Sequence, residues 1–312
     1  MIKDLLNPKN WGLILIFIIA RILVLLPYSV LMKIGKFFGF MLYFFMKKRL
    51  EIVRINIKLC FPELNEQEHQ ALVKANMISY GKAIFEFLLA FMASDKKIAG
   101  LYTTEGSEYL HEALKGKTGA ILLCAHFTPL ELAGRMGSMS ISNMKEKLYV
   151  MYRQHKNPLL EDFVVTRRSR YAKGLIPKTK VLRMLKVLRS NNAVWYAQDQ
   201  NASNNMVFAP FFGTLASTTT ALSRITKITG AKVVPFLFYR KTDDSGYGLE
   251  VFPALENFPS GDDVADATRI NQLIEGWVKE HPDQYLWIHR RFKVRPPGEA
   301  PIYPVKKKKP SK

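Results

Sequence analysis

One histidine in this sequence stands where acid–base chemistry can be built. His126 ends the apolar run 119–126, and Glu131 follows it five residues later. The run predicts a strand, and Thr-Pro-Leu-Glu predicts a helix start with Thr128 as N-cap and Glu131 at N3. A turn between them lets the Glu131 carboxylate approach the imidazole, fix its tautomer and stabilise its charged form. We therefore predict a general base with its orienting acid at a strand's carboxyl end, where open α/β sheets bind ligands.

The same residues allow two other interpretations. Glu131 could serve only as the acid of a capping box, with His126 an ordinary loop histidine. Cys124 lies two residues before His126, on the same face of a strand, so a Cys–His dyad could carry an acyl group covalently. A thiol inside ILLCA is more typical of a small buried apolar residue. The local pattern alone leaves these alternatives open.

The composition limits the kinds of partner and cofactor that this protein is expected to bind. Lys and Arg number 46 against 26 Asp and Glu, a formal net charge of +20. Such an excess predicts an anionic partner, which can be nucleic acid, an anionic bilayer surface or an acidic substrate. The two cysteines, Cys60 and Cys124, and the scattered histidines have no metal-ligand spacing. We expect a reducing compartment, no structural metal and no organic cofactor.

The N-terminal part predicts membrane attachment. Residues 11–32 carry one charge, Arg21, and one helix-bending Pro27. Their length suffices for a spanning helix of about 20 residues. A central arginine costs about 2.5–3.5 kcal/mol on insertion scales, which weakens a simple span. The aromatic and basic segment that follows suits the headgroup level. We assign residues 1–49 as anchor and interfacial segment, with a buried helical hairpin as the alternative.

The remaining chain predicts an α/β fold, a mixed sheet flanked by helices. Residues 50–116 read as helical. Apolar runs that predict strands lie at 119–126, 147–153, 193–198, 231–239 and 247–252. Helical patterns lie between or after them at 180–189, 217–229 and 265–280. This alternation predicts one α/β domain over 50–298. The basic tail 299–312 is expected to be disordered, with attachment to anionic lipid as a second possibility.

The chain resembles the late (secondary) acyltransferases of lipid A biosynthesis, the lauroyl and myristoyl transferases of Gram-negative bacteria. The segment from His126 to Glu131 is similar to that family's His-x-x-x-x-Glu motif. Six further fragments match in order, at 152–160, 170–176, 193–201, 207–219, 230–236 and 284–296. The resemblance covers nearly the whole chain and implies a glycerolipid-acyltransferase-like fold.

The resemblance implies a reaction and its partners. An acyl chain moves from acyl carrier protein to a hydroxyl on a 3-hydroxyacyl chain of a lipid A precursor, with His126 as base and no acyl-enzyme. It implies a catalytic domain on the cytoplasmic side of the bacterial inner membrane, in contact with membrane lipids and not with nucleic acid. The precursor phosphates, the acidic carrier protein and the anionic leaflet together account for the positive charge.

Other candidate site residues lie in the matched fragments. Arg153 and Arg170 suit a phosphate or the oxyanion, because guanidinium stays charged and can bind such oxygens bidentately. Either could instead be a surface arginine. Asp199 follows the strand at 193–198 and is expected at the same sheet edge as His126, where it could anchor Arg170 or a neighbour. A helix cap or Asx turn is its alternative.

Two pairs complete the candidates. Phe211 and Phe212 resemble a family segment and could line an acyl groove, although core packing is an equally good interpretation. Arg290 and Arg291 lie in a basic, aromatic run that would suit nucleic acid out of context and phosphate or interface contact within this family.

Two rival functions remain to be weighed. An acyltransferase of the same superfamily could act on a different membrane lipid, which binding of the phosphorylated disaccharide would discriminate. A non-enzymatic basic membrane or nucleic-acid binding protein would tolerate Glu131→Ala and would lose affinity steeply with salt.

Overall fold

The structure is a computed structural model that describes residues 11–141 and 143–304. The helices are α2 (Trp11–Leu23), α3 (Tyr28–Phe45), α4 (Lys47–Cys60), α5 (Glu66–Met92), α6 (Asp95–Ala99), α7 (Ser107–Lys115), α8 (Leu130–Ser140), α9 (Pro158–Arg168), α10 (Val181–Arg189), α11 (Ala221–Thr229), α12 (Asp263–Glu280) and the 3-10 helix η2 (Pro282–Gln284). The strands are β1 (Tyr102–Glu105), β2 (Ala120–Cys124), β3 (Leu148–Tyr152), β4 (Gly174–Pro177), β5 (Ala193–Ala197), β6 (Met206–Phe211), β7 (Thr214–Thr219), β8 (Lys232–Arg240) and β9 (Tyr247–Val251).

A seven-stranded sheet forms the centre, in the order β1-β9-β8-β2-β5-β3-β4. Its neighbours are parallel except for the antiparallel pair β8–β9, so the sheet is mixed. Strand β2 is buried at every position, with β5 and β8 on its two sides. A strand that is buried on both faces is continuously apolar, which is why β2 could be predicted from the sequence. The predicted mixed α/β fold, with its five apolar strands, is confirmed.

The hairpin of β6 and β7 corrects one expectation. These strands pair antiparallel in a separate two-stranded sheet. Phe212 and Gly213 connect them with positive φ angles of 50° and 72°, a left-handed turn that reverses the chain. The helix expected from Ser217 is therefore wrong at its start, because residues 217–219 belong to β7 and α11 begins at Ala221.

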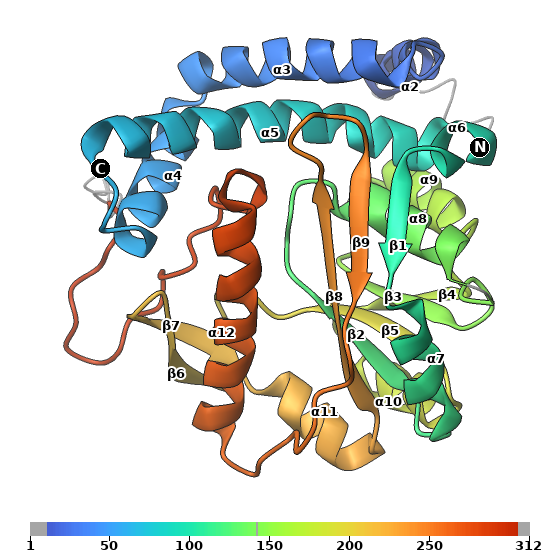
Figure 1. Ribbon diagram of the computed structural model, residues 1–312, viewed down its shortest axis with the longest axis vertical. Helices are drawn as coiled ribbons and strands as arrows, with labels where there is room; N and C mark the ends of the chain where they lie inside the picture. Colours follow the sequence, from blue (N-terminus) through green and yellow to red (C-terminus); the bar gives the residue numbers. More distant parts are fainter. Residues whose placement is uncertain (1–10, 142, 305–312) are drawn as a thin grey trace, which may run out of the picture.

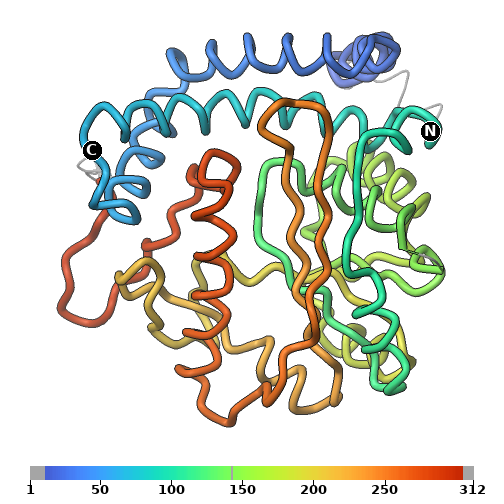
Figure 2. Tube along the Cα trace, viewed as in Figure 1, coloured from blue at the N-terminus to red at the C-terminus, as the bar shows by residue number. Residues whose placement is uncertain are grey.

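Helices α3 and α5 form a layer along one end of the sheet (Figures 1 and 2). Glycines allow their backbones to touch, since a Cβ on Gly81 would lie 2.2 Å from the Gly39 amide nitrogen. Asn65 and Glu68 begin α5 with a capping box. At its other end, buried Arg135 from α8 donates to the carbonyl oxygens of Leu89, Ala90 and Ala93. The bonds to Ala90 and Ala93 satisfy carbonyls that a helix end leaves free.

The apolar stretch at residues 11–32 is divided between α2 and the start of α3, with the helix-bending Pro27 directly before α3. The chain bends between Leu23 and Tyr28, where Lys97 Nζ donates to the carbonyl oxygens of Val24 (2.5 Å) and Leu26. Within the described ranges, α3 is the helix long and apolar enough to cross a membrane by length and composition. The boundary expected at residue 50 falls inside α4.

Most large apolar side chains that stay exposed in the described part of the chain lie on α2 and α3. Ile22 is 61% exposed, Phe37 63% and Phe45 78%. A contiguous apolar surface of this kind is typical of a membrane or protein contact. The tail expected to be disordered lies outside the described residues from position 305 onward.

Candidate active site

His126 and Asp199 are the central pair of the site. The Nδ1 atom of His126 lies 2.6 Å from Asp199 Oδ1, and the backbone N–H of His126 donates to Asp199 Oδ2 at 2.8 Å. The Asp199 side chain is 1% exposed and that of His126 is 25% exposed. An ionised carboxylate accepts from Nδ1–H and so fixes the tautomer with Nε2 as the acceptor. Within residues 11–141 and 143–304, Nε2 has no hydrogen-bond partner.

Sheet register explains why these two residues meet. Strands β2 and β5 are parallel neighbours in which Cys124 pairs with Ala197. His126 and Asp199 each lie two residues beyond that pair, at the carboxyl ends of adjacent strands. Ligands bind at this edge in open α/β sheets. The expectation that Asp199 shares a sheet edge with His126 is confirmed.

The pair also sets the charge of the imidazole. Burial opposes protonation of His126, but the negative charge of Asp199 and its hydrogen bond outweigh burial and raise the pKa of His126 above its ordinary value. For Asp199, burial favours the neutral acid, yet the His126 charge and the hydrogen bonds lower the pKa of this carboxyl below its ordinary value. Asp199 is thus held ionised beside a histidine able to accept a proton.

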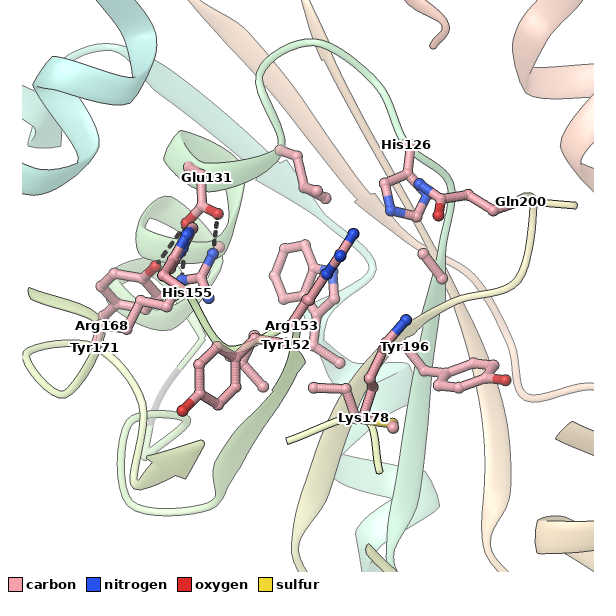
Figure 3. A pocket seen from close by; sticks show the side chains of 16 residues that line it. His126, Glu131, Tyr152, Arg153, His155, Arg168, Tyr171, Lys178, Tyr196 and Gln200 are labelled. Atoms are coloured by element: carbon pink, nitrogen blue, oxygen red, sulfur yellow. Dashed lines mark hydrogen bonds and ion pairs between the residues drawn. The ribbon is translucent and has the colours of Figure 1, made fainter. Parts of the chain in front are cut away.

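Glu131 has other partners than the one expected. Its carboxylate accepts from Arg168 Nε at 3.1 Å, from Arg168 Nη2 and from the Tyr171 hydroxyl at 3.3 Å. The expectation that Glu131 orients His126 is therefore wrong. Helix α8 begins at Leu130, one residue later than predicted, and Glu131 in its first turn faces α9. Figure 3 shows Glu131 and His126 apart, with the dashed bonds running from Glu131 to Arg168 and Tyr171.

The contacts of Thr128 explain why this residue does not cap α8. Thr128, expected as the N-cap of α8, has its hydroxyl 2.9 Å from Ser79 Oγ and accepts from Arg240 Nη2 at 3.4 Å. It ties the loop after His126 to α5 and β8 instead of capping the helix. The backbone N–H of Thr128 also donates to the Gln284 carbonyl oxygen at 2.8 Å. The loop that carries His126 is thereby fixed from three directions.

A pocket of about 540 Å³ brings His126 and Glu131 to one cavity. Cationic side chains on its wall are Arg153, Arg168 and Lys178, and His155 also lines it. Apolar surface comes from residues that include Leu130, Val150, Met151 and Trp195. Figure 3 shows the Arg153 guanidinium in the space between Glu131 and His126, and Lys178 directed towards His126 from below in that view. A cavity of this size with convergent polar groups is typical of a ligand site.

The two arginines predicted to bind a phosphate or the oxyanion lie in different places. Arg153 lines the pocket, whereas Arg170 does not and instead lies 3.7 Å from Asp95. Sequence reasoning missed Arg168, Tyr171 and Lys178 as pocket residues. The available signal was the run of arginines at the end of α9, but the pattern alone does not show which of them faces Glu131.

Neither expected phenylalanine reaches the pocket. Phe211 is fully buried, with ring centroids 6.1 Å from Tyr285 and 6.2 Å from Phe292. Phe212 packs on Phe61 at 5.1 Å. Phe211 belongs to the core and the half-buried Phe212 packs against it, which fits the core-packing interpretation, while a place for either ring in an acyl groove stays a prediction.

Arg290 and Arg291, the basic pair near the C-terminus, contact other parts of the fold rather than the pocket. Arg291 is 2% exposed and donates to the Ser217 carbonyl oxygen at 2.6 Å and to Thr218 Oγ1 at 2.7 Å. The Arg290 guanidinium lies over the Tyr303 ring, 5.7 Å from its centroid. Arg291 holds the C-terminal segment on β7, and neither arginine lines the pocket beside His126. No group of three or more metal-ligating side chains lies in the described ranges.

Comparison with known proteins decides the family. The sequence profile of the family described as bacterial lipid A biosynthesis acyltransferase matches residues 2–294. The chain belongs to this family. The expected recognition is confirmed, and the protein is an O-acyltransferase of lipid A biosynthesis.

Three relatives show how fully this acyltransferase matches. It is 34% identical to the lipid A biosynthesis lauroyltransferase of Escherichia coli (strain K12), over 96% of this chain and 97% of the relative. It is 33% identical to the palmitoleoyltransferase of the same strain, again over 96% and 97%. The myristoyltransferase of that strain is 26% identical over 98% of this chain and 94% of the relative.

Proposed function

We propose that this acyltransferase moves a fatty acyl chain from acyl carrier protein to a hydroxyl of a 3-hydroxyacyl chain on a lipid A precursor. His126 is the general base and Asp199 is the residue that orients it. The observation that carries the proposal is the 2.6 Å contact between His126 Nδ1 and Asp199 Oδ1 at the edge of the pocket. An unactivated alcohol needs such a base, whose contribution is about 10²- to 10⁴-fold.

The proposed step is direct transfer. The Nε2 atom of His126 takes the proton of the acceptor hydroxyl while its oxygen attacks the thioester carbonyl carbon. The C–S bond then breaks, and the carrier-protein thiolate receives the proton from the imidazolium. Asp199 stabilises the imidazolium between these events without itself becoming protonated.

The cationic side chains at the pocket wall have a task separate from that of the His126–Asp199 pair. The tetrahedral intermediate carries an oxyanion and the precursor carries phosphates, so cationic donors are needed at the pocket wall. Arg153 and Lys178 are the exposed candidates, and Arg168 is held in place by the Glu131 carboxylate. Glu131 remains part of the proposed machinery, as the residue that positions Arg168. Arg170, Phe211, Phe212, Arg290 and Arg291 have no part in it, because their contacts lie elsewhere.

The acyl donor and the membrane complete the proposal. The net charge of +20 favours the acidic carrier protein and an anionic leaflet. The exposed apolar side chains of α2 and α3 support attachment at the inner membrane, with the pocket on the cytoplasmic side. The lauroyl and palmitoleoyl relatives are almost equally similar to the chain, so the test below uses thioesters of several chain lengths.

The test is acyl transfer by purified protein in detergent. Wild type and His126→Ala would be offered a tetra-acylated lipid A precursor with a panel of acyl carrier protein thioesters. We expect transfer by wild type alone, with one preferred chain length. A folded wild type that transfers from no carrier-protein thioester, but does so from another donor or to another lipid, would contradict the proposed substrates.

A further inference from the structure

A second cavity lies outside the site described above, between α2 and α9. It has a volume of about 480 Å³ and is lined almost entirely by apolar side chains. Its α2 wall includes Ile18 and Ile22, which are 53% and 61% exposed, so the cavity opens at the apolar surface of the N-terminal helices. Phe17 of α2 stacks on Phe163 of α9, with ring centroids 4.3 Å apart, and both rings line the cavity. We call this cavity the α2–α9 groove.

Helix α9 separates the groove from the catalytic pocket. Leu159, Phe163 and Arg167 are four residues apart, share one helix face and line the groove. Arg168 is one position on, about 100° around the helix, and binds Glu131 on the pocket side. The two cavities therefore lie on different sides of one helix, and the groove is distinct from the pocket beside His126.

Two arginines line the groove, and among the described residues no carboxylate pairs with either of them. Arg21 uses Nη1 to donate to the Met92 carbonyl oxygen at 2.9 Å, and Arg167 lies over the Phe163 ring, 5.3 Å from its centroid. Within residues 11–141 and 143–304, neither has a carboxylate within 4.0 Å. The neighbouring Asp95 is already bound to Arg135 and lies 3.7 Å from Arg170.

The cationic groups are close enough to repel one another. Burial, together with the positive charges of Arg170, Arg21 and Arg135, lowers the pKa of Arg167 below its ordinary value. An arginine stays charged in proteins, so this repulsion is relieved by an anion rather than by deprotonation. The groove thus combines an apolar lining with two cationic side chains.

We infer that the α2–α9 groove binds one anionic bilayer phospholipid, with its phosphate between Arg21 and Arg167 and one acyl chain along the apolar wall. A guanidinium binds phosphate oxygens bidentately, and the slot opens where α2 exposes its apolar face. A zwitterionic headgroup would bring a cation back towards the arginines and is disfavoured. The inference needs the membrane attachment proposed above but not the acyl-transfer chemistry.

The test uses the full-length protein in detergent and native mass spectrometry. Protein would be incubated with equal amounts of dioleoyl phosphatidylglycerol and dioleoyl phosphatidylcholine. We expect preferential retention of the anionic lipid, reduced about tenfold or more in Arg21→Gln/Arg167→Gln, the loss of a charge-assisted contact. The matched control is Arg183→Gln, an exposed arginine on α10 at the opposite end of the molecule (Figure 1). Ile18→Gln should weaken retention of both lipids by making the slot polar.

Each contrary result has a defined meaning. Equal retention of the two lipids by wild type, or an equal loss in Arg183→Gln, would overturn the site. Displacement of phosphatidylglycerol by the lipid A precursor, one for one, would assign the groove to the acceptor and also overturn it. Thermal unfolding and acyl transfer of each variant report folding, and Arg167→Gln alone serves if the double variant is unstable. Arginine-dependent retention by a protein without transfer to lipid A would reject the proposed function and keep the inference.

Discussion

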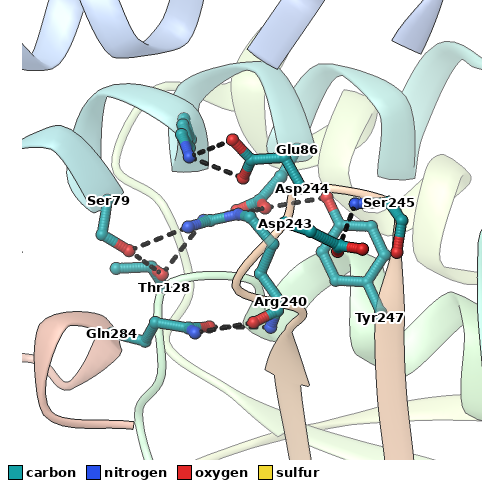
Figure 4. A network of polar contacts seen from close by, with 10 residues as sticks. Ser79, Glu86, Thr128, Arg240, Asp243, Asp244, Ser245, Tyr247 and Gln284 are labelled. Atoms are coloured by element: carbon teal, nitrogen blue, oxygen red, sulfur yellow. Dashed lines mark hydrogen bonds and ion pairs between the residues drawn. The ribbon is translucent and has the colours of Figure 1, made fainter. Parts of the chain in front are cut away.

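Two clusters of carboxylate, cation and hydroxyl lie near the loop after His126, and they differ in which atoms remain without a hydrogen bond. In one, Arg240 donates to Glu86 at 2.6 and 2.9 Å and to Ser79 at 3.1 Å, while Tyr247 donates to Glu86 at 2.8 Å (Figure 4). The side chains of Glu86 and Arg240 are 1% and 3% exposed. This cluster joins α5 to β8 and β9 and has no open face.

The cluster at the pocket is also built from charged and hydrogen-bonding side chains, but one of its atoms lacks a hydrogen-bond partner among the described residues. His126 is 25% exposed, its Nε2 has no partner within the described ranges, and Glu131 and Arg168 are 21% and 12% exposed on the wall of a cavity. A saturated buried ion pair holds elements together, whereas a pair with an unbonded atom facing a cavity is arranged for a ligand. Charge alone does not separate the two, but the completeness of hydrogen bonding does.

Asp199→Asn is expected to have the largest effect on activity. The amide preserves the shape but no longer selects the tautomer with Nε2 as acceptor, and we expect acyl transfer to fall about 10²- to 10⁴-fold. Because the Asp199 charge raises the pKa of His126, its removal should move the acid limb of the pH–rate profile to lower pH. The profile of the residual activity measures this shift, and an unmoved limb would show that Asp199 does not act on His126.

Glu86→Ala breaks the saturated cluster and should act on stability alone. It leaves Arg240 buried without its carboxylate, and we expect a loss of about 3–5 kcal/mol in the free energy of unfolding. Denaturant titration in detergent measures it. Glu112→Ala, which removes an exposed pair with Lys115, is the control and should cost under about 1 kcal/mol. Reduced activity per folded molecule of Glu86→Ala would mean that this cluster also shapes the site.

Glu131→Gln tests the division of labour within the pocket. It weakens a charged contact to Arg168, a loss of about 1.5–3 kcal/mol, so we expect transfer to fall about 10- to 100-fold. The acid limb of the pH profile should stay in place, because His126 is oriented by Asp199. A limb shifted as in Asp199→Asn would return Glu131 to the role of orienting residue.

The central strands could be predicted because burial on both faces leaves a continuous apolar run, as in β2, β5 and β8. Short strands such as β1 and β4 lack that pattern, with four residues each and partial exposure. The hairpin β6–β7 was hidden because its turn is made by Phe212 in a left-handed conformation, which a bulky residue seldom adopts. Local pattern therefore identified the sheet core but not its additions.

For the site, the sequence located His126 and the sheet edge but not the pairing. The meeting of His126 with Asp199 depends on the register of two strands 73 residues apart in sequence, and that of Glu131 with Arg168 on the packing of α8 against α9. The local motif predicts Glu131 as the partner of His126 because the two residues are close in sequence. The structure selects Asp199 because parallel strands place equivalent positions side by side.

Cys124→Ser should have the smallest effect and closes the covalent alternative. Cys124 is fully buried, and burial, followed by the nearby Asp199 charge, raises the pKa of its thiol well above the ordinary value. The thiolate that a nucleophile requires is therefore disfavoured, and the Cys124 Sγ donates to the Tyr196 carbonyl oxygen at 3.6 Å. A serine hydroxyl can make the same bond. We expect steady-state transfer within about twofold of wild type, a difference under about 0.5 kcal/mol, whereas a folded but inactive variant would restore Cys124 as an acyl carrier.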